Sequence, residues 1–143
     1  MKGMHPMSEN KQDDLREAVQ AIIYGEATPL GGGVMDIPAA IFLCDLTGTM
    51  ATPWAEAGIE CWCVDTRHSI RRDRDDGNIH FVWGDARSWT PPVGRQIVFV
   101  AAFPPCTHVS VSGTRDHPKK RGYMLRDALE VFESCGLAAA WSG

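Results

Sequence analysis

Residues 97–106 read IVFVAAFPPC, and this stretch decides the fold. Its first six residues are all apolar, as expected for a strand that is buried on both faces of a sheet. Pro104 and Pro105 then end the strand, because each fixes φ near about −65° and has no backbone N–H to donate. Cys106 therefore follows a stiff loop at the carboxyl end of a buried strand. This position predicts a nucleophile facing a pocket.

Three earlier apolar runs, at residues 40–44, 60–64 and 79–83, show a similar pattern. The first two run directly into Asp45 and Asp65, and the third is followed by Gly84 and Asp85. A short helix over 52–57, with Thr52 as its cap and an early proline, separates the first two strands. Apolar strands that alternate with helices or loops predict an α/β fold with a mostly parallel sheet covered on both faces. Ligands of such sheets bind at the carboxyl ends of the strands.

The remaining segments are less informative. Residues 1–12 are polar and unpatterned, which predicts a disordered tail, and residues 13–24 have the apolar spacing of an amphipathic helix. The glycines at 31–33 predict a flexible connector. Mixed charges over 67–76 predict a solvated loop, and the apolar spacing over 121–140 predicts a final helix. We expect one domain over residues 13–143.

Composition and charge limit the possible functions. The 143 residues carry a net charge of −4 and are 44% hydrophobic, which is normal for a globular protein. No apolar run reaches the length of a membrane helix, and we find no secretory signal, so the default location is the cytoplasm. A negative chain does not hold nucleic acid by bulk charge, so any such contact must be local. The candidate residues for a local contact are Arg115, Lys119, Lys120, Arg121 and Arg126.

The five cysteines are an odd number, and without an export signal a disulfide framework is not expected. Cys61 and Cys63 alternate along one strand, and two thiols without a second pair favour packing over a zinc site. We also expect Cys44 and Cys135 in the core. His108 is a candidate base or substrate contact, although exposed loop histidines more often have no such role. Trp54 and Trp83 are candidates to stack on a ligand, with core packing as the alternative.

Five short motifs resemble the cytosine-5 DNA methyltransferases in order and spacing, most closely the small phage-type members. The resemblance covers roughly residues 40–115, and its last two motifs are the most discriminating. The motifs are Asp45-Leu46-Thr47-Gly48, Val64-Asp65, Gly84-Asp85, Pro104-Pro105-Cys106 and Ser110-Val111-Ser112-Gly113. The implied fold is the Rossmann-like fold of S-adenosylmethionine-dependent methyltransferases.

The resemblance also implies roles for these residues. The turn formed by Asp45, Leu46, Thr47 and Gly48 would line the S-adenosylmethionine site, with Pro104 also at this site. Asp65 would bind the ribose hydroxyls, and Asp85 the adenine amino group. Cys106 would be the nucleophile that adds to carbon 6 of a flipped-out cytosine in DNA. Apart from the resemblance, any DNA contact would come from the basic cluster at Arg115, Lys119, Lys120 and Arg121, with a solvated loop and helix start as the alternative interpretation.

The sequence also departs from the family. Thr107-His108 follows Cys106 where glutamine is commoner, and the glycine-rich first motif is shorter than usual. We find no Glu-Asn proton-donor segment in residues 116–143, so the resemblance implies the N-terminal part of a methyltransferase, with the sheet truncated after its fourth strand. A missing half or second chain would then complete it. The alternative is a non-catalytic remnant that binds S-adenosylmethionine or serves as an interaction module. A nicotinamide-dependent enzyme is disfavoured, because Gly48 lacks the partner glycines of that fingerprint.

Overall fold

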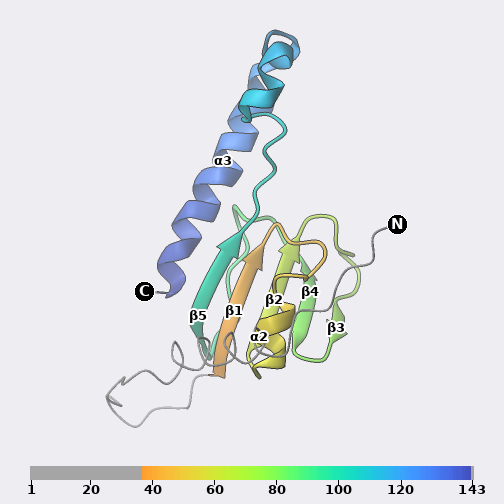
Figure 1. Cartoon of the computed structure of the whole chain (residues 1–143), viewed down its shortest axis with the longest axis vertical. Helices are drawn as coiled ribbons and strands as arrows, with labels where there is room; N and C mark the ends of the chain where they lie inside the picture. The colour runs from red at the N-terminus through yellow and green to blue at the C-terminus, as the bar shows by residue number, and fades with distance from the viewer. Residues whose placement is uncertain (1–36, 143) are drawn as a thin grey trace, which may run out of the picture.

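The computed structural model describes residues 37–142, apart from the side chains of residues 112–114 and 117. Its centre is a five-stranded sheet with the strand order β3-β4-β2-β1-β5 (Figure 1). Strands β1, β2, β4 and β5 are parallel, and β3 pairs antiparallel with β4 at one edge. The strands are β1 (Ile37–Leu43), β2 (Glu60–Asp65), β3 (Arg74–Asp76), β4 (Ile79–Trp83) and β5 (Arg95–Ala102). The predicted mostly parallel α/β sheet is confirmed, and its order is compatible with a Rossmann-like fold.

The two faces of the sheet carry separate apolar clusters, because side chains alternate along each strand. Ala40 and Phe42 of β1 belong to the cluster under helix α2 (Thr52–Glu56), where Trp54 stacks on Phe99 with ring centroids 4.2 Å apart. Ile41 and Leu43 belong to the opposite cluster. Helix α3 (Gly122–Ala138) covers that cluster with Cys135 and Ala138.

Helix α3 extends well past the carboxyl ends of the strands (Figure 1). Its last turns and the following 3₁₀ helix η2 (Ala139–Ser142) pack along the sheet. Its N-terminal part lies beyond the sheet beside the 3₁₀ helix η1 (Val111–Lys119), and along α3 the side chains of Leu125, Leu129 and Phe132 are more than 40% exposed. This arrangement leaves the carboxyl ends of the strands accessible between the sheet and α3.

Several details differ from the sequence predictions. The predicted solvated loop over 67–76 contains β3, a short edge strand with every residue exposed. The predicted cap of α2 is wrong, because Ala51 precedes the helix and the Thr52 hydroxyl instead donates to the carbonyl of Gly48 at 3.3 Å. The predicted tail, first helix and glycine connector lie outside the described residues. Within the described residues, no helix is long and apolar enough to cross a membrane.

Candidate active site

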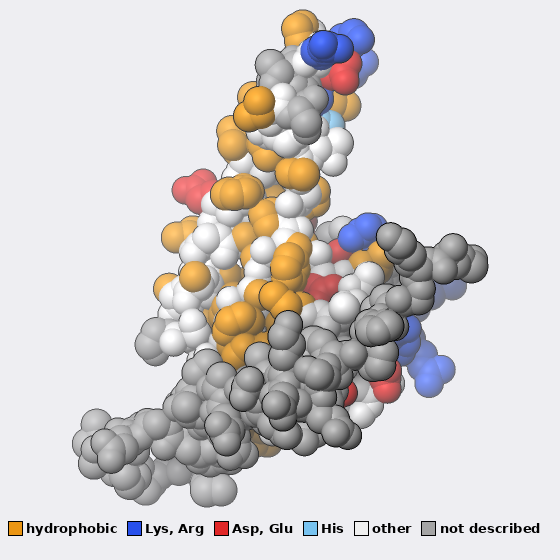
Figure 2. Space-filling view, in the orientation of Figure 1, with side chains coloured by type: hydrophobic (Ala, Val, Ile, Leu, Met, Phe, Trp, Pro, Cys, Tyr) orange, Lys and Arg blue, Asp and Glu red, His pale blue; other side chains and the backbone are white. Residues whose placement is uncertain are grey.

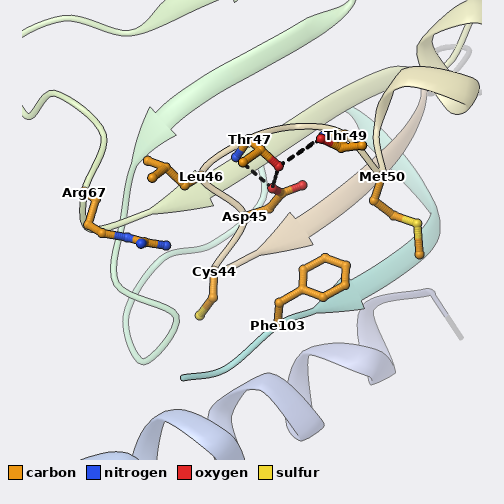
Figure 3. Close-up of a pocket in the computed structure, with 8 residues that line it drawn as sticks. All are labelled: Cys44, Asp45, Leu46, Thr47, Thr49, Met50, Arg67 and Phe103. Atoms are coloured by element: carbon orange, nitrogen blue, oxygen red, sulfur yellow. Dashed lines mark hydrogen bonds between the residues drawn. The ribbon is translucent and has the colours of Figure 1, made fainter. Parts of the chain in front are cut away.

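The turn after β1 is organised by Asp45. Its Oδ1 accepts backbone N–H groups from Thr47 and Gly48, each at 2.9 Å, and the Thr47 hydroxyl at 3.2 Å (Figure 3). The second oxygen, Oδ2, lies 3.9 Å from the sulfur of Cys63. Asp45 is only 7% exposed, so these bonds satisfy a carboxylate that has largely lost water. The residue therefore shapes the turn that the sequence motif predicts.

Gly48 allows this turn to close against the sheet. Its φ is +70°, a left-handed conformation that glycine adopts without a steric cost. A Cβ at this position would lie 2.7 Å from the ring of Phe81. The sharp turn predicted at Gly48 is therefore present, although the glycine itself is buried and lines neither of the cavities described below.

The ends of β2 and β4 share one local structure, an aspartate followed two residues later by an arginine. Asp65 Oδ1 accepts the backbone N–H of Arg67 at 2.8 Å, and Asp85 Oδ1 accepts that of Arg87 at 2.9 Å. Each arginine also bonds its aspartate through Nε and Nη2, at 3.0 and 3.0 Å for Arg67 and at 2.9 and 2.6 Å for Arg87. Such two-point pairs fix the geometry of both groups.

These arginines stabilise the ionised form of the two carboxylates. Burial alone would raise the pKa of Asp65, but the bonds from the Arg67 side chain and backbone outweigh it, and the pKa falls below its usual value. The pKa of Asp85 is lowered chiefly by the side-chain bond from Arg87. Both carboxylates are ionised at neutral pH and can accept hydrogen bonds from a ligand.

The two arginines differ in their other contacts. Arg87 also bonds Asp127 of α3 through Nη1 and lies 3.8 Å from Glu130, so it connects β4 with the helix. The side chain of Arg67 is 66% exposed, and Asp65 is its one ion-pair partner within the described residues. Arg87 is thus a structural link, whereas Arg67 is held at one end only.

Cys106 lies on the loop that leaves β5. The loop begins with a bond from Phe103 N–H to the Leu43 carbonyl at 2.9 Å, which extends the pairing of β1 and β5. The Cys106 carbonyl then accepts N–H groups from Val109 at 3.1 Å and Ser110 at 2.8 Å, forming a turn. The cysteine is exposed, and its carbonyl is held by the turn that follows it. This is the fixed, accessible thiol that the sequence predicts.

Two cavities lie side by side at the carboxyl ends of the strands. The Asp45 cavity, about 500 Å³, is lined by the turn after β1 together with Arg67 and Phe103 (Figure 3). The Cys106 cavity, about 650 Å³, includes Asp65, Asp85, Pro104 and Cys106 in its lining. Cys44, Arg67 and Phe103 line both cavities, so these three residues form the boundary between them.

The structure thus brings three of the four predicted strand-end groups, Asp65, Asp85 and Cys106, into one cavity. Asp45, Leu46 and Thr47 line the adjoining cavity instead. The four groups therefore do not share a single pocket, because the turn after β1 lies on the other side of Arg67. The predicted residues occupy one continuous edge of the sheet in two compartments.

The secondary candidates are divided. Cys61 and Cys63 are fully buried, as predicted for packing residues. Trp54 is a core residue, and Trp83 is 41% exposed but lines neither cavity. His108 is half-buried, and its Nδ1 is buried without a hydrogen bond inside the described part of the chain. The described residues contain no group of three His, Cys, Asp or Glu side chains arranged for a metal ion.

Cys44 was predicted as a core residue, and this prediction is only partly right. Its free thiol forms a hydrogen bond with the thiol of Cys135 on α3, but Cys44 is half-buried and lines both cavities. Its φ is +57°, and it is the only non-glycine residue with positive φ in the described part of the chain. Such a conformation costs about 1–2 kcal/mol and is often found at functional sites.

The basic residues predicted to contact DNA lie on η1 and the start of α3. Arg115, Lys119 and Arg121 are exposed, while Lys120 is half-buried and donates to the Thr107 carbonyl at 2.8 Å. Lys119 also pairs with Asp116 at 3.2 Å. Figure 2 shows Lys and Arg side chains gathered at this protruding end of the molecule. Lys120 thereby ties the basic tip to the residue following Cys106.

Sequence reasoning missed Arg67, Arg87 and Phe103 as lining residues. A signal for the arginines was present, since Asp65-Thr66-Arg67 and Asp85-Ala86-Arg87 repeat the same spacing at two neighbouring strand ends. The sequence does not distinguish Phe103 as a boundary residue, because Phe103 directly follows the apolar strand and resembles another residue of it.

Comparison of the chain with protein-family models, curated proteins and solved structures finds no match. The site must therefore be interpreted from its own geometry.

Proposed function

We propose that this protein transfers a methyl group from S-adenosylmethionine to carbon 5 of cytosine in DNA, with Cys106 as the nucleophile. One observation carries the proposal: an exposed thiol on a fixed loop shares a cavity with two ionised carboxylates. The thiol suits covalent addition to a base, and the carboxylates suit hydrogen bonding to a nucleoside.

The cavities fit a ligand of this size and chemistry. Their volumes, about 500 and about 650 Å³, fall within the range of small-molecule sites. Asp65 and Asp85 would accept bonds from the ribose hydroxyls and the adenine amino group, beside Pro104. Leu46, with the turn at Asp45 and Thr47, would line the other end of the site, while Gly48 shapes that turn from behind. When bound, S-adenosylmethionine supplies an electrophilic methyl group.

The protein's own contribution is nucleophilic catalysis by Cys106. Its thiolate would form a bond to carbon 6 of the cytosine, which makes carbon 5 electron-rich enough to accept the methyl group. Loss of the carbon 5 proton and of the thiolate then restores the aromatic ring. The target base must leave the DNA stack to reach the loop, and an exposed loop at the edge of the sheet is accessible to such a base.

Methyl transfer tests the proposal. The chain is incubated with S-adenosylmethionine carrying a tritiated methyl group and with cytosine-containing duplex DNA, and label in the DNA is counted. Label that depends on Cys106 and is lost in Cys106→Ser supports the function. Equal label with Cys106→Ser contradicts the role of the thiol, and Cys61→Ser is the control for loss of a buried cysteine.

A second candidate is a binding module that holds S-adenosylmethionine without catalysing transfer. It is favoured because no glutamate lines the Cys106 cavity within the described residues. The acidic residues that line it are Asp65, Asp85 and Asp127. Because arginine bonds hold the pKa of Asp65 and Asp85 low, neither is suited to protonate the cytosine ring. This candidate would be favoured if the folded chain binds S-adenosylmethionine in calorimetry but transfers no label to the DNA in the assay above.

A further inference from the structure

The side chain of Arg67 occupies both oxygens of Asp65. The two bonds are each 3.0 Å long, and the backbone N–H of the same residue bonds Oδ1 at 2.8 Å. With Arg67 in this position, Asp65 is only 5% exposed. A ligand with hydroxyl donors therefore has to replace the guanidinium to bind Asp65 through two hydrogen bonds.

Arg67 also separates the two cavities. It lines both of them, together with Cys44 and Phe103. In Figure 3 its side chain extends from the loop after β2 toward the space between Leu46 and Cys44. An elongated ligand that reaches from the turn at Asp45 to Asp65 has to pass this side chain. Two independent features, the occupied carboxylate and the divided space, thus involve the same residue.

Arg67 is able to move without disrupting the fold. Its side chain is 66% exposed and, within the described residues, forms an ion pair only with Asp65. Arg87, the equivalent residue on β4, is held by Asp85 and by Asp127 of α3. Displacement of Arg67 therefore exchanges one partly exposed ion pair for new ligand bonds, whereas displacement of Arg87 would also detach the helix.

We infer that Arg67 is a displaceable competitor for the ligand site, which keeps Asp65 covered until a ligand with a pair of vicinal hydroxyls takes its place. The inference rests on the proposed function and adds a residue, Arg67, that competes with the ribose hydroxyls for Asp65. Removal of the guanidinium leaves the backbone bond to Asp65 intact and opens the passage between the cavities. Ligand binding then no longer has to break the ion pair.

Calorimetry with S-adenosylhomocysteine and its 2′,3′-dideoxy analogue tests this inference. We expect Arg67→Ala to bind S-adenosylhomocysteine up to about fivefold more tightly than the wild type, because loss of a partly exposed ion pair is worth up to about 1 kcal/mol. The dideoxy analogue cannot bond Asp65 through hydroxyls, so its gain should be smaller. Arg72→Ala is the matched control, because Arg72 is exposed on the same loop and lines neither cavity.

Arg67→Lys provides a second variant, since it keeps the charge but loses the two-point pair, and it should give a smaller gain. Thermal unfolding verifies that each variant is folded. The competitor role is overturned if Arg67→Ala binds S-adenosylhomocysteine with the same affinity as the wild type or more weakly. An equal gain in affinity for both ligands overturns it as well. No binding by the folded wild type and all variants contradicts the proposed function itself, and the inference falls with it.

Discussion

Arg87 connects the carboxyl end of β4 to helix α3 by bonding Asp85 and Asp127 at the same time. Within the described residues, this charged contact joins the candidate site to the helix, in addition to the apolar packing of Cys135 and Ala138 on the sheet. The same arginine therefore contacts both α3 and an aspartate that lines the Cys106 cavity.

Arg87→Gln should lower the free energy of unfolding by about 1 kcal/mol at pH 7, as expected for a partly exposed ion-pair network. Because Arg87 lowers the pKa of Asp85, the pair stabilises the fold above the ordinary aspartate pKa of 3.8, and this contribution is lost as the pH falls through the lowered value. Urea denaturation at pH 7 and near pH 3 measures both effects. The difference between wild type and variant should shrink at the lower pH.

Arg126→Gln is the control for this prediction. Arg126 is 76% exposed and lies 3.8 Å from Glu130 on the same helix, so its loss should change stability by less than about 0.5 kcal/mol. Equal effects of the two substitutions at pH 7 would show that the Arg87 network does not hold α3.

Gly48→Ala should destabilise the fold more than Gly94→Ala. Both glycines have positive φ, +70° and +75°, so both variants incur a backbone cost of about 1 kcal/mol. Only at Gly48 would the new Cβ also meet the ring of Phe81 at 2.7 Å, whereas nothing lies within 4 Å at Gly94. Thermal or urea unfolding of the two variants measures the difference. Equal losses would mean that the turn after β1 is not packed as described.

Thiol alkylation should distinguish Cys106 from the buried cysteines. Burial raises the pKa of Cys61 to about 12, and burial followed by the charge of Asp45 raises that of Cys63 further. At pH 8 the Cys61 thiol is therefore almost entirely protonated, and the side chain is also fully buried. Iodoacetamide followed by peptide mass spectrometry should label Cys106 first. Labelling of Cys61 or Cys63 at a similar rate in the folded chain would contradict the description of the core.

The basic tip should contribute to DNA binding. Replacing Arg115, Lys119 and Arg121 together with alanine should weaken binding to a duplex about tenfold or more at low salt. It should also reduce the slope of log affinity against log salt by up to about 3, one for each lost phosphate contact. Fluorescence anisotropy measures both quantities. Arg72→Ala, on the loop after β2, serves as the control, and an unchanged salt slope in the triple variant would remove the tip from the interface.

Much of the fold could be predicted from the sequence because the decisive strands are mostly apolar. The strand expected at 79–83 has those bounds in the structure, and Cys106 follows β5 as expected. Strand β3 was missed because its residues, Arg74 to Asp76, are all charged and exposed. Antiparallel pairing with β4 places it at the edge of the sheet, where its side chains are exposed to solvent.

The candidate site was predictable in its residues but not in its contacts. Strand ends identified Asp65, Asp85 and Cys106, because parallel strands finish along one edge. The pairing of each aspartate with an arginine two residues later depends on the turn geometry, which propensity alone does not give. The division into two cavities depends on the direction of one long side chain, that of Arg67, and on where Phe103 lies after the strand.

The most direct test of the central claim is covalent trapping of Cys106. The folded chain is mixed with S-adenosylmethionine and a duplex that contains 5-azacytosine in place of cytosine, and the products are digested and analysed by mass spectrometry. The account predicts a DNA adduct on the peptide that contains Cys106 and no adduct with Cys106→Ser. A folded chain that binds both the cofactor and the duplex but forms no adduct, or forms it at another cysteine, would contradict the account.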